Sequence, residues 1–205
     1  MTGLAWSALA ATSAPASPGG RMPLVVKPIF TYPLAARRSQ TSWRNWGGIE
    51  TAADVQQELT RIQGELAKLL KMADFPVRFL PVSSIRHPKE VSAIQDLAGA
   101  DAILVHAAGD GGGHLTADLN MIGNLGKDVI LFVRHRSGPL YYWYEGVNAR
   151  YLHQCRDNQA VKVLPEDVVV DRLDEVLWRL RALAGLRNTV GSRVVAVGGP
   201  GGWET

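Results

Sequence analysis

Short apolar runs alternate with amphipathic stretches along most of the chain. Six runs have the composition of buried strands: Leu24–Thr31, Val77–Val82, Ala102–Ala107, Val129–Val133, Val168–Val170 and Arg193–Val197. Pro28 indicates an irregular or edge position for the first of them, because proline cannot donate to a sheet ladder. Strands that alternate with helices predict a mostly parallel sheet with helices on both faces. We therefore expect a doubly wound α/β domain, Rossmann-like or flavodoxin-like.

Local signals place the first helices. Thr51-x-x-Asp54 has the spacing of a capping box, and the stretch after it puts six apolar residues on one stripe: Val55, Leu59, Ile62, Leu66, Leu69 and Leu70. Pro88 is suited to start a second helix, whose inward residues would be Val91, Ile94 and Leu97.

Two more helices follow from periodicity, and one stretch stays ambiguous. A third helix is expected near Leu115–Leu125, with Gly126 as its C-cap. Asp171 is expected to cap a helix that Gly185 ends. The pattern of Tyr141–His153 is ambiguous and compatible with a helix.

The two ends of the chain differ from its middle. Residues 1–21 contain a small-residue apolar run and Ala14-Pro15-Ala16, a small-x-small cleavage pattern, without the basic segment of a secretory signal. Either the leader belongs to a signal that starts upstream, or it is a disordered Ala/Ser/Pro segment, so cytoplasmic and exported locations both stay open. Residues 22–192 form the predicted domain. Residues 193–205 would be a last strand and the Gly-rich start of a further domain, as in a fragment of a larger protein.

Composition and charge exclude several classes of protein. The 205 residues carry 22 Lys and Arg against 19 Asp and Glu, a net charge of +3 without a long basic stripe. We therefore expect no nucleic-acid partner, and no run is long enough to span a membrane. The single cysteine, Cys155, excludes an internal disulfide and a CxxC redox site. An idle thiol is the default interpretation of Cys155, and a nucleophile is the alternative.

Four of the predicted strands end in loops rich in Gly, Arg, His and Trp. Ligands of open α/β sheets bind outside the carboxyl ends of the strands, so these loops and the aromatic stretch 141–145 supply the candidate binding residues: Arg37, Arg38, Trp43, Arg44, Asp110, His114, Arg134, His135, Arg136 and Glu145. Arginine forks bind carboxylate or phosphate, and aromatic rings stack on sugars or partner chains. Each cluster also has a structural interpretation, as a solvated basic loop, a Gly-rich turn or an aromatic cover of the core.

Other chemistry has weaker support in the sequence. The turn Gly109–His114 is suited to hold an anion, but it is neither GxGxxG nor a P-loop. The five histidines show no metal-ligand spacing with carboxylates: His87, His106, His114, His135 and His153. No GxSxG motif supports a serine triad. We expect neither a cofactor nor a metal in this chain.

Several of these motifs together resemble the N-terminal region of L-fucose/L-arabinose isomerase-like proteins. They are Lys27-Pro28, the long Arg/Trp loop, Ala107-Ala108-Gly109-Asp110 and Val194–Gly199, and the resemblance covers about Leu24 to the end. It implies a Rossmann-like front domain that helps oligomerisation and covers a neighbouring subunit's active site. Aldose–ketose isomerisation with a divalent metal such as Mn²⁺ would belong to the full-length form, because the family's metal ligands lie further along the chain.

Three functions are compatible with this sequence. The first is a sugar-isomerase-like N-terminal domain that contributes to carbohydrate recognition and oligomerisation without catalysing alone; its ligand is a sugar or an anionic small molecule. The second is an exported small-ligand-binding module of flavodoxin-like topology. The third is a nucleotide-using enzyme built on Gly111–Gly113.

Overall fold

The computed structural model describes residues 21–32, 34, 48–109, 114–141 and 163–190. Its strands are β1 (Leu24–Thr31), β2 (Val77–Phe79), β3 (Ser83–Ile85), β4 (Ala102–Ala107), β5 (Asp128–Val133) and β6 (Val168–Val170). Its helices are α1 (Ala52–Met72), α2 (Pro88–Val91), α3 (His114–Gly123) and α6 (Leu173–Thr189), with 3-10 turns η1 (Gln95–Gly99) and η2 (Pro165–Asp167). The predicted strand 193–197 and the stretch 142–153 lie outside the described residues.

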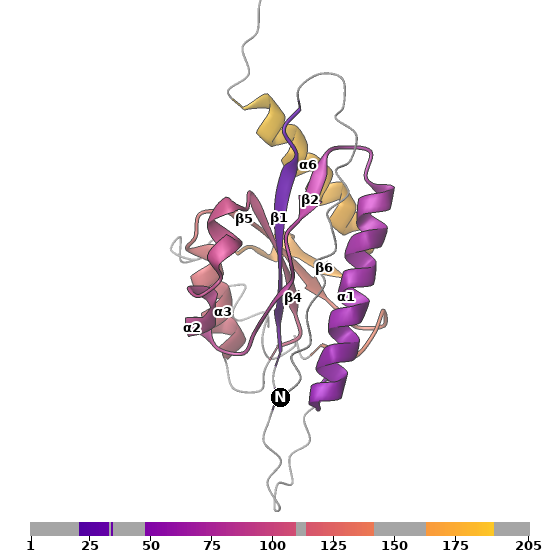
Figure 1. Ribbon diagram of the computed structural model, residues 1–205, viewed down its shortest axis with the longest axis vertical. Helices are drawn as coiled ribbons and strands as arrows, with labels where there is room; N and C mark the ends of the chain where they lie inside the picture. The colour runs from indigo at the N-terminus through magenta and orange to yellow at the C-terminus, as the bar shows by residue number, and fades with distance from the viewer. Residues whose placement is uncertain (1–20, 33, 35–47, 110–113, 142–162, 191–205) are drawn as a thin grey trace, which may run out of the picture.

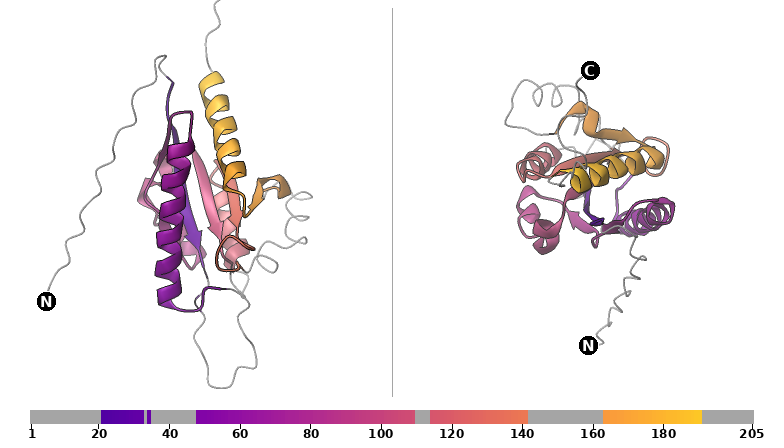
Figure 2. Two further views of the ribbon diagram at one scale, coloured as in Figure 1. Left: turned by 90° about the vertical axis from the view of Figure 1, so that its right-hand side faces the viewer. Right: turned by 90° about the horizontal axis from the view of Figure 1, so that it is seen from above.

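These elements form the predicted doubly wound α/β fold. The strands lie in the order β2-β1-β4-β5-β6, β3 also pairs with β1, and every pair is parallel. If β2 and β3 are counted as one interrupted strand, the order is the 2-1-3-4-5 order of flavodoxin-like sheets. Helices α1 and α6 contact each other on one side of the sheet, and α2 contacts α3 on the other (Figures 1 and 2). The order reverses between β1 and β4.

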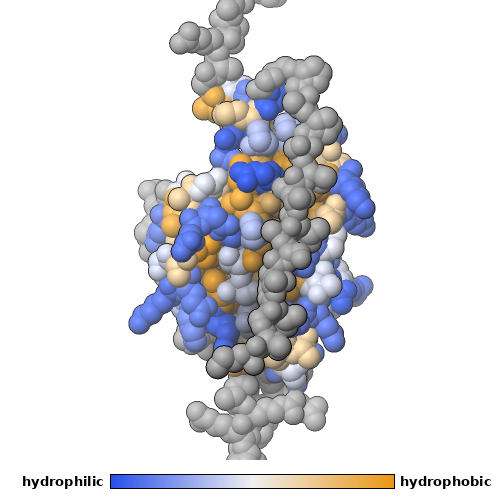
Figure 3. All heavy atoms as spheres, in the orientation of Figure 1, coloured by the Kyte–Doolittle hydropathy of each residue, from blue (hydrophilic) through white to orange (hydrophobic). Residues whose placement is uncertain are grey.

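The core lies around the two central strands. Every residue of β1 and β4 is buried, as expected for strands covered on both faces. Helix α1 starts with the predicted capping box: the Asp54 N–H donates to the Thr51 hydroxyl, and the Asp54 carboxylate accepts from the Thr51 N–H. Of the predicted apolar stripe, Leu70 is 46% exposed, and the buried Glu58 takes a place on that face instead. The exterior seen in Figure 3 mixes charged and apolar residues.

The strand predicted as Val77–Val82 ends at Phe79, and a second short strand on the same edge, β3, begins just beyond the predicted end, at Ser83. Val26 pairs with Phe79 and Ile29 pairs with Ser83, so two residues of β1 face three residues of the edge strand. One extra residue in one of two paired strands is a β-bulge, which bends the strand and interrupts the ladder. The sequence pattern missed the bulge because Leu80-Pro81-Val82 continues the apolar run.

Pro28 was predicted at an irregular or edge position, but it lies in β1, which has neighbours on both sides. The irregularity is in the adjacent edge strand, between β2 and β3. Leu24 and Tyr32 donate their N–H groups towards the edge strand, and Val26 accepts there. Because residues of the same parity bond to the same side of a strand, a donor at position 28 would point at the bulge. The missing N–H of Pro28 therefore leaves no regular ladder bond unmade.

Three helix predictions need correction. The helix that starts at Pro88 ends at Val91, where the Ser92 hydroxyl donates to the Lys89 carbonyl, a local bond that competes with helix continuation. Helix α6 continues past Gly185 to Thr189, and the burial of four of its side chains, Val176, Leu177, Leu180 and Ala184, offsets the roughly 1 kcal/mol cost of a helical glycine. Asp171 is not its N-cap, a position that Arg172 occupies. The third helix ends at Gly123, and Gly126 has the positive φ expected of a residue that terminates a turn.

Candidate functional site

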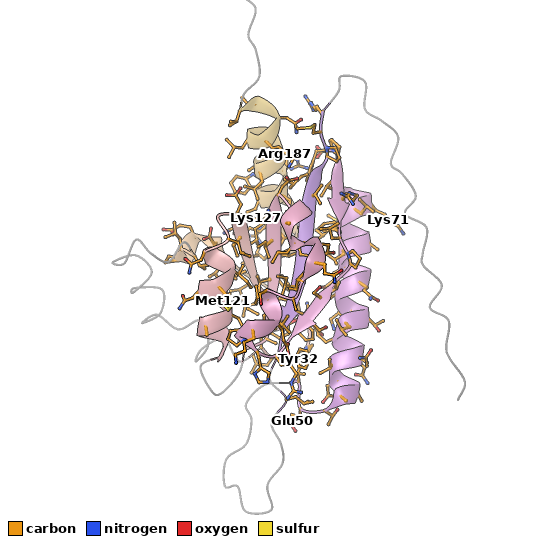
Figure 4. All side chains as sticks on the ribbon, turned by 60° about the vertical axis from the view of Figure 1, so that its left-hand side comes forward. Tyr32, Glu50, Lys71, Met121, Lys127 and Arg187 are labelled. Carbon is orange, nitrogen blue, oxygen red and sulfur yellow. The ribbon has the colours of Figure 1, made fainter. Side chains whose placement is uncertain are left out.

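The carboxyl ends of β1, β4, β5 and β6 lie at one edge of the sheet, because these strands are parallel neighbours. Tyr32, Gly109, Arg134 and Asp171 follow the four strands there. Figure 4 shows Tyr32 at this end of the molecule, near Glu50, which precedes α1. The edge next to the reversal between β1 and β4 is where open α/β sheets bind ligands, so this carboxyl edge is the candidate site.

Arg134 lies inside the protein at this edge rather than on its surface. Its side chain is 0% exposed, and its guanidinium donates to both carboxylate oxygens of Glu65 at 2.8 and 2.6 Å and to Glu58 Oε1 at 2.5 Å. The Tyr141 hydroxyl donates to the same Glu58 oxygen at 2.6 Å. Burial by itself lowers the pKa of Arg134. The Glu65 hydrogen bonds and the neighbouring negative charges have a larger, opposite effect, so the pKa lies above its ordinary value. Arg134 is therefore a fixed cation that joins β5 to α1.

The residues after Arg134 are held by Asp171, which follows β6. The Asp171 carboxylate accepts from the backbone N–H groups of His135, Arg136 and Ser137 at 2.8 to 3.0 Å. Partial burial raises the pKa of Asp171, but a hydrogen bond with the Ser137 side chain and the three backbone hydrogen bonds together lower it well below its usual range. Asp171 has φ of 59°, a left-handed conformation that aspartate tolerates better than most residues. The turn after β5 is thus an anion-binding nest that the protein fills with its own carboxylate.

Two glycines pack the turn after β5 against its surroundings. A Cβ at Gly48 would lie 2.6 Å from the Pro139 Cβ, and the Gly48 N–H donates to the Leu140 carbonyl at 2.8 Å. A Cβ at Gly138 would lie 2.8 Å from the Arg134 Cδ. The end of the long loop after β1 and the turn after β5 are therefore in direct contact at the carboxyl edge.

The structure brings together only part of the predicted set. His135 and Arg136 are exposed on the turn that Asp171 holds, as a ligand-contacting role requires. Arg134, predicted to contact ligand, instead has protein partners for its guanidinium, because two carboxylates of α1 face it. His114, predicted to close the Gly-rich turn, is the first residue of α3, which begins one residue before its predicted start. The other predicted residues lie outside the described part: Arg37, Arg38, Trp43, Arg44, Asp110 and Glu145.

An open depression of about 740 Å³ lies between β3 and the segment formed by α2 and η1. It is lined by Lys27 of β1 and reaches the carboxyl edge of the sheet at Tyr32. Its polar lining has three hydroxyl-bearing side chains, one amide and four charged side chains: Tyr32, Ser83, Ser84, Gln95, Lys27, Arg86, Glu90 and Asp96. None of these residues was predicted as a binding residue, although Pro28, next to Lys27, indicated an irregularity in this strand. The Ser83-Ser84 pair directly after an apolar run, followed by Arg86, is a further signal in the sequence.

Arg86 and Glu90 form the rim of this depression next to the carboxyl edge. The Glu90 Oε2 accepts from the Arg86 backbone N–H at 2.6 Å, and the Arg86 guanidinium donates to the Leu34 carbonyl at 3.2 Å. Tyr32 stacks on Phe30 with ring centroids 5.0 Å apart. An aromatic ring, hydroxyls and charges of both signs thus lie around one open concave surface.

His106 is the most isolated polar side chain in the described part of the chain. It lies on β4 with both register neighbours aromatic, Phe30 and Phe132, and its ring nitrogens have no hydrogen-bond partner among the described residues. Burial and the nearby charge of Arg134 lower the pKa of His106 to about 3. The ring is therefore neutral at ordinary pH.

Neither a membrane-spanning helix nor a cluster of metal-ligating side chains occurs within the described ranges. Comparison with models of known protein families finds no match for this chain, and comparison with curated proteins finds none either.

Proposed function

We propose that this chain is a carbohydrate-recognition domain, the front part of a sugar-isomerase-like protein, and that it does not catalyse alone. The observation that carries the proposal is the depression at the end of β3, where the Tyr32 ring adjoins the hydroxyls of Ser83 and Ser84 and the charges of Arg86 and Glu90. Sugars offer hydroxyls that both donate and accept, so they need both kinds of partner within one site. Their apolar ring faces pack on aromatic side chains.

The ligand on this proposal extends from the depression towards the turn after β5. Tyr32 belongs to both regions, since it lines the depression and directly follows β1 at the carboxyl edge. His135 and Arg136 are then within the same edge of the sheet, held by Asp171. Isomerisation of the sugar, with a divalent metal such as Mn²⁺, would need residues of a following part of the protein.

Direct binding tests the proposal. Saturation-transfer NMR and calorimetry with a panel of neutral pentoses and hexoses should detect binding to the chain. The double variant Ser84→Ala/Arg86→Ala should weaken binding at least about tenfold, since it removes two of the hydrogen-bonding groups. Lys71→Ala, on α1 away from Tyr32 (Figure 4), is the matched control and should bind as the wild type does. Absence of binding to every sugar, or equal binding by the double variant, would exclude this function.

Oligomerisation is the second part of the proposal, and α6 is the element that supports it. Trp178 and Leu186 are 63% and 56% exposed and lie eight residues apart, which places them on the same face of the helix. Exposed tryptophans are typical centres of protein interfaces. Sedimentation velocity should show a homo-oligomer that Trp178→Lys dissociates. A monomeric wild-type chain at about 100 μM would count against this part alone.

The alternative proposal is an exported small-ligand-binding module, which the flavodoxin-like strand order favours as a stand-alone architecture. Expression with an intact N-terminus and N-terminal sequencing of the mature protein distinguishes the two. Cleavage after Ala16 would support export, whereas dependence of sugar turnover on a following metal-binding part would support the isomerase-like protein.

A further inference from the structure

The outer face of α6 is apolar and exposed. Trp178, Ala182, Gly185 and Leu186 recur at the spacing of one helix face. All four are exposed, and a Cβ at Gly185 would meet nothing within 4 Å. The opposite side of the helix supplies its buried residues: Val176, Leu177, Leu180 and Ala184. An exposed tryptophan at one end of an apolar helix face is typical of a surface that binds a partner.

The arginines of this region are neutralised by the chain's own carboxylates. Four ion pairs do this: Arg172 with Asp174, Arg179 with Glu175, Arg181 with Asp74 and Arg187 with Asp101. The chain has a net charge of +3, so two copies would repel each other through a basic surface. The balanced face of α6 lets a second copy approach without that repulsion, and it provides no excess of positive charge for an acidic partner.

The charges at the two ends of α6 favour an antiparallel arrangement of two copies. The first turn contains Asp174 and Glu175, and the last turn contains Arg187. In an antiparallel pair the acidic turn of each copy lies next to the basic turn of the other, whereas a parallel pair would bring like charges together. The helix dipoles favour the same arrangement, because opposite ends then lie side by side.

The side chains of this face complement one another in such a pair. Trp178 and Leu186 lie four residues before and four residues after Ala182. A two-fold axis at Ala182 therefore places Trp178 of one copy against the partner's Leu186, and the small Ala182 and the adjacent Gly185 let the two helices approach closely at the axis. A helix of 17 residues is about 26 Å long, so the contact is at the small end of specific interfaces.

We infer that two copies of this chain pair through the outer faces of α6, antiparallel about a two-fold axis at Ala182. This inference rests on the oligomerisation part of the proposed function, because it assigns the partner and the arrangement of the same helix. It is independent of sugar binding. Because the contact is small, the dimer should dissociate in the micromolar range.

Sedimentation equilibrium on the full 205-residue chain tests the position of the axis. Ala182→Glu brings two like charges together at the axis and should weaken the dimer at least about tenfold. Ala67→Glu, at an exposed alanine of α1, is the matched control and should leave dissociation within about twofold of the wild type. Thermal unfolding of both variants shows that the fold is kept.

Cross-linking with a short bis-maleimide tests the direction of the helices, in a Cys155→Ser background that removes the chain's single cysteine. Ala182→Cys should give a covalent dimer, because the two copies of a residue at the axis face each other. Asp174→Cys should not, since its two copies would lie about 24 Å apart along an antiparallel pair and side by side in a parallel pair.

The outcomes separate this inference from the proposed function. A dimer that Ala182→Glu does not weaken, or one that cross-links through Asp174→Cys, overturns the inference while oligomerisation through α6 or another surface stands. A chain that is monomeric at about 100 μM overturns both the inference and the oligomerisation part. Carbohydrate recognition is decided separately by the panel of neutral sugars.

Discussion

Replacing His106 with leucine should make the protein less sensitive to mild acid. The pKa of His106 is lowered from 6.5 to about 3 in the folded state, first by burial and then by the charge of Arg134. The unfolded chain therefore binds a proton between pH 6.5 and 3 that the folded chain does not. Stability must fall as pH decreases through this window. His106→Leu removes the group and with it this part of the pH dependence.

The magnitude follows from the two pKa values. At pH 5, which is 1.5 units below the pKa of the unfolded histidine, the unfolded chain is protonated at this position and the folded chain is still neutral. The free energy of unfolding of the wild type is therefore about 2 kcal/mol lower than at pH 7.5. For a chain of this length that corresponds to roughly 4–8 °C in Tm. Above pH 7 the leucine variant should be at least as stable as the wild type, because a buried polar group without a partner costs about 1–3 kcal/mol.

Urea unfolding followed by tryptophan fluorescence, at intervals between pH 5 and 8, measures both effects. The informative quantity is the difference in unfolding free energy between wild type and His106→Leu at each pH. His87→Gln, at an exposed histidine, controls for the loss of a histidine as such. A difference that stays constant from pH 8 to 5 would refute the low pKa. A variant destabilised by more than about 2 kcal/mol at pH 7.5 would show that the ring nitrogens have a partner after all.

Three further changes test the framework of the carboxyl edge. Arg134→Met leaves the buried Glu58 with the half-exposed Arg61 as its remaining cationic partner, so equilibrium denaturation should show a loss of up to about 3–5 kcal/mol. Asp171→Ala removes the acceptor of three N–H groups and should cost about 1–2 kcal/mol, whereas Asp171→Asn should cost less because the amide oxygen still accepts. Gly48→Ala brings a methyl group to 2.6 Å from a proline carbon and should lower Tm, whereas Gly64→Ala, with open space on α1, should raise it slightly.

The fold could be predicted because independent features of the sequence, such as apolar strand runs and helix-capping residues, indicate the same elements. The run Ala102–Ala107 is apolar throughout and became a strand buried on both faces, and Thr51 and Asp54 formed the capping box that their spacing indicated. Where two local signals competed, the prediction was wrong. Gly185 by itself favours a helix end. The helix nevertheless continues, because its neighbour Ala184 packs into the core, and a local sequence pattern contains no information about such tertiary contacts.

The candidate site was less predictable because the role of a charged residue depends on its distant partners. Arg134 looks like a ligand-binding arginine next to His135 and Arg136, and only the position of α1 shows that Glu58 and Glu65 occupy its guanidinium. The depression, in contrast, was not predicted at all. Its residues are spread from position 27 to position 96, and no spacing rule connects a lysine in one strand with an aspartate sixty-nine residues later.

One sequence signal did point to the depression, although its meaning required the structure. Pro28 indicated an irregularity in the first strand, and the structure places that irregularity in the neighbouring strand, as a bulge opposite Lys27 and Pro28. In an uninterrupted ladder the Pro81 carbonyl would point away from β1, because Pro76 and Leu80 are the residues of the edge strand that bond to β1. The break therefore accompanies the turn of the Pro81 carbonyl to 2.7 Å from the Lys27 ammonium. The three features are therefore compatible. Pro28 lacks an N–H, the bulge opposite it requires none, and the Pro81 carbonyl in the bulge accepts from the buried Lys27. Lys27 is consequently held as a buried cation whose partners, the Pro81 carbonyl and the Asp96 carboxylate, belong to the protein itself.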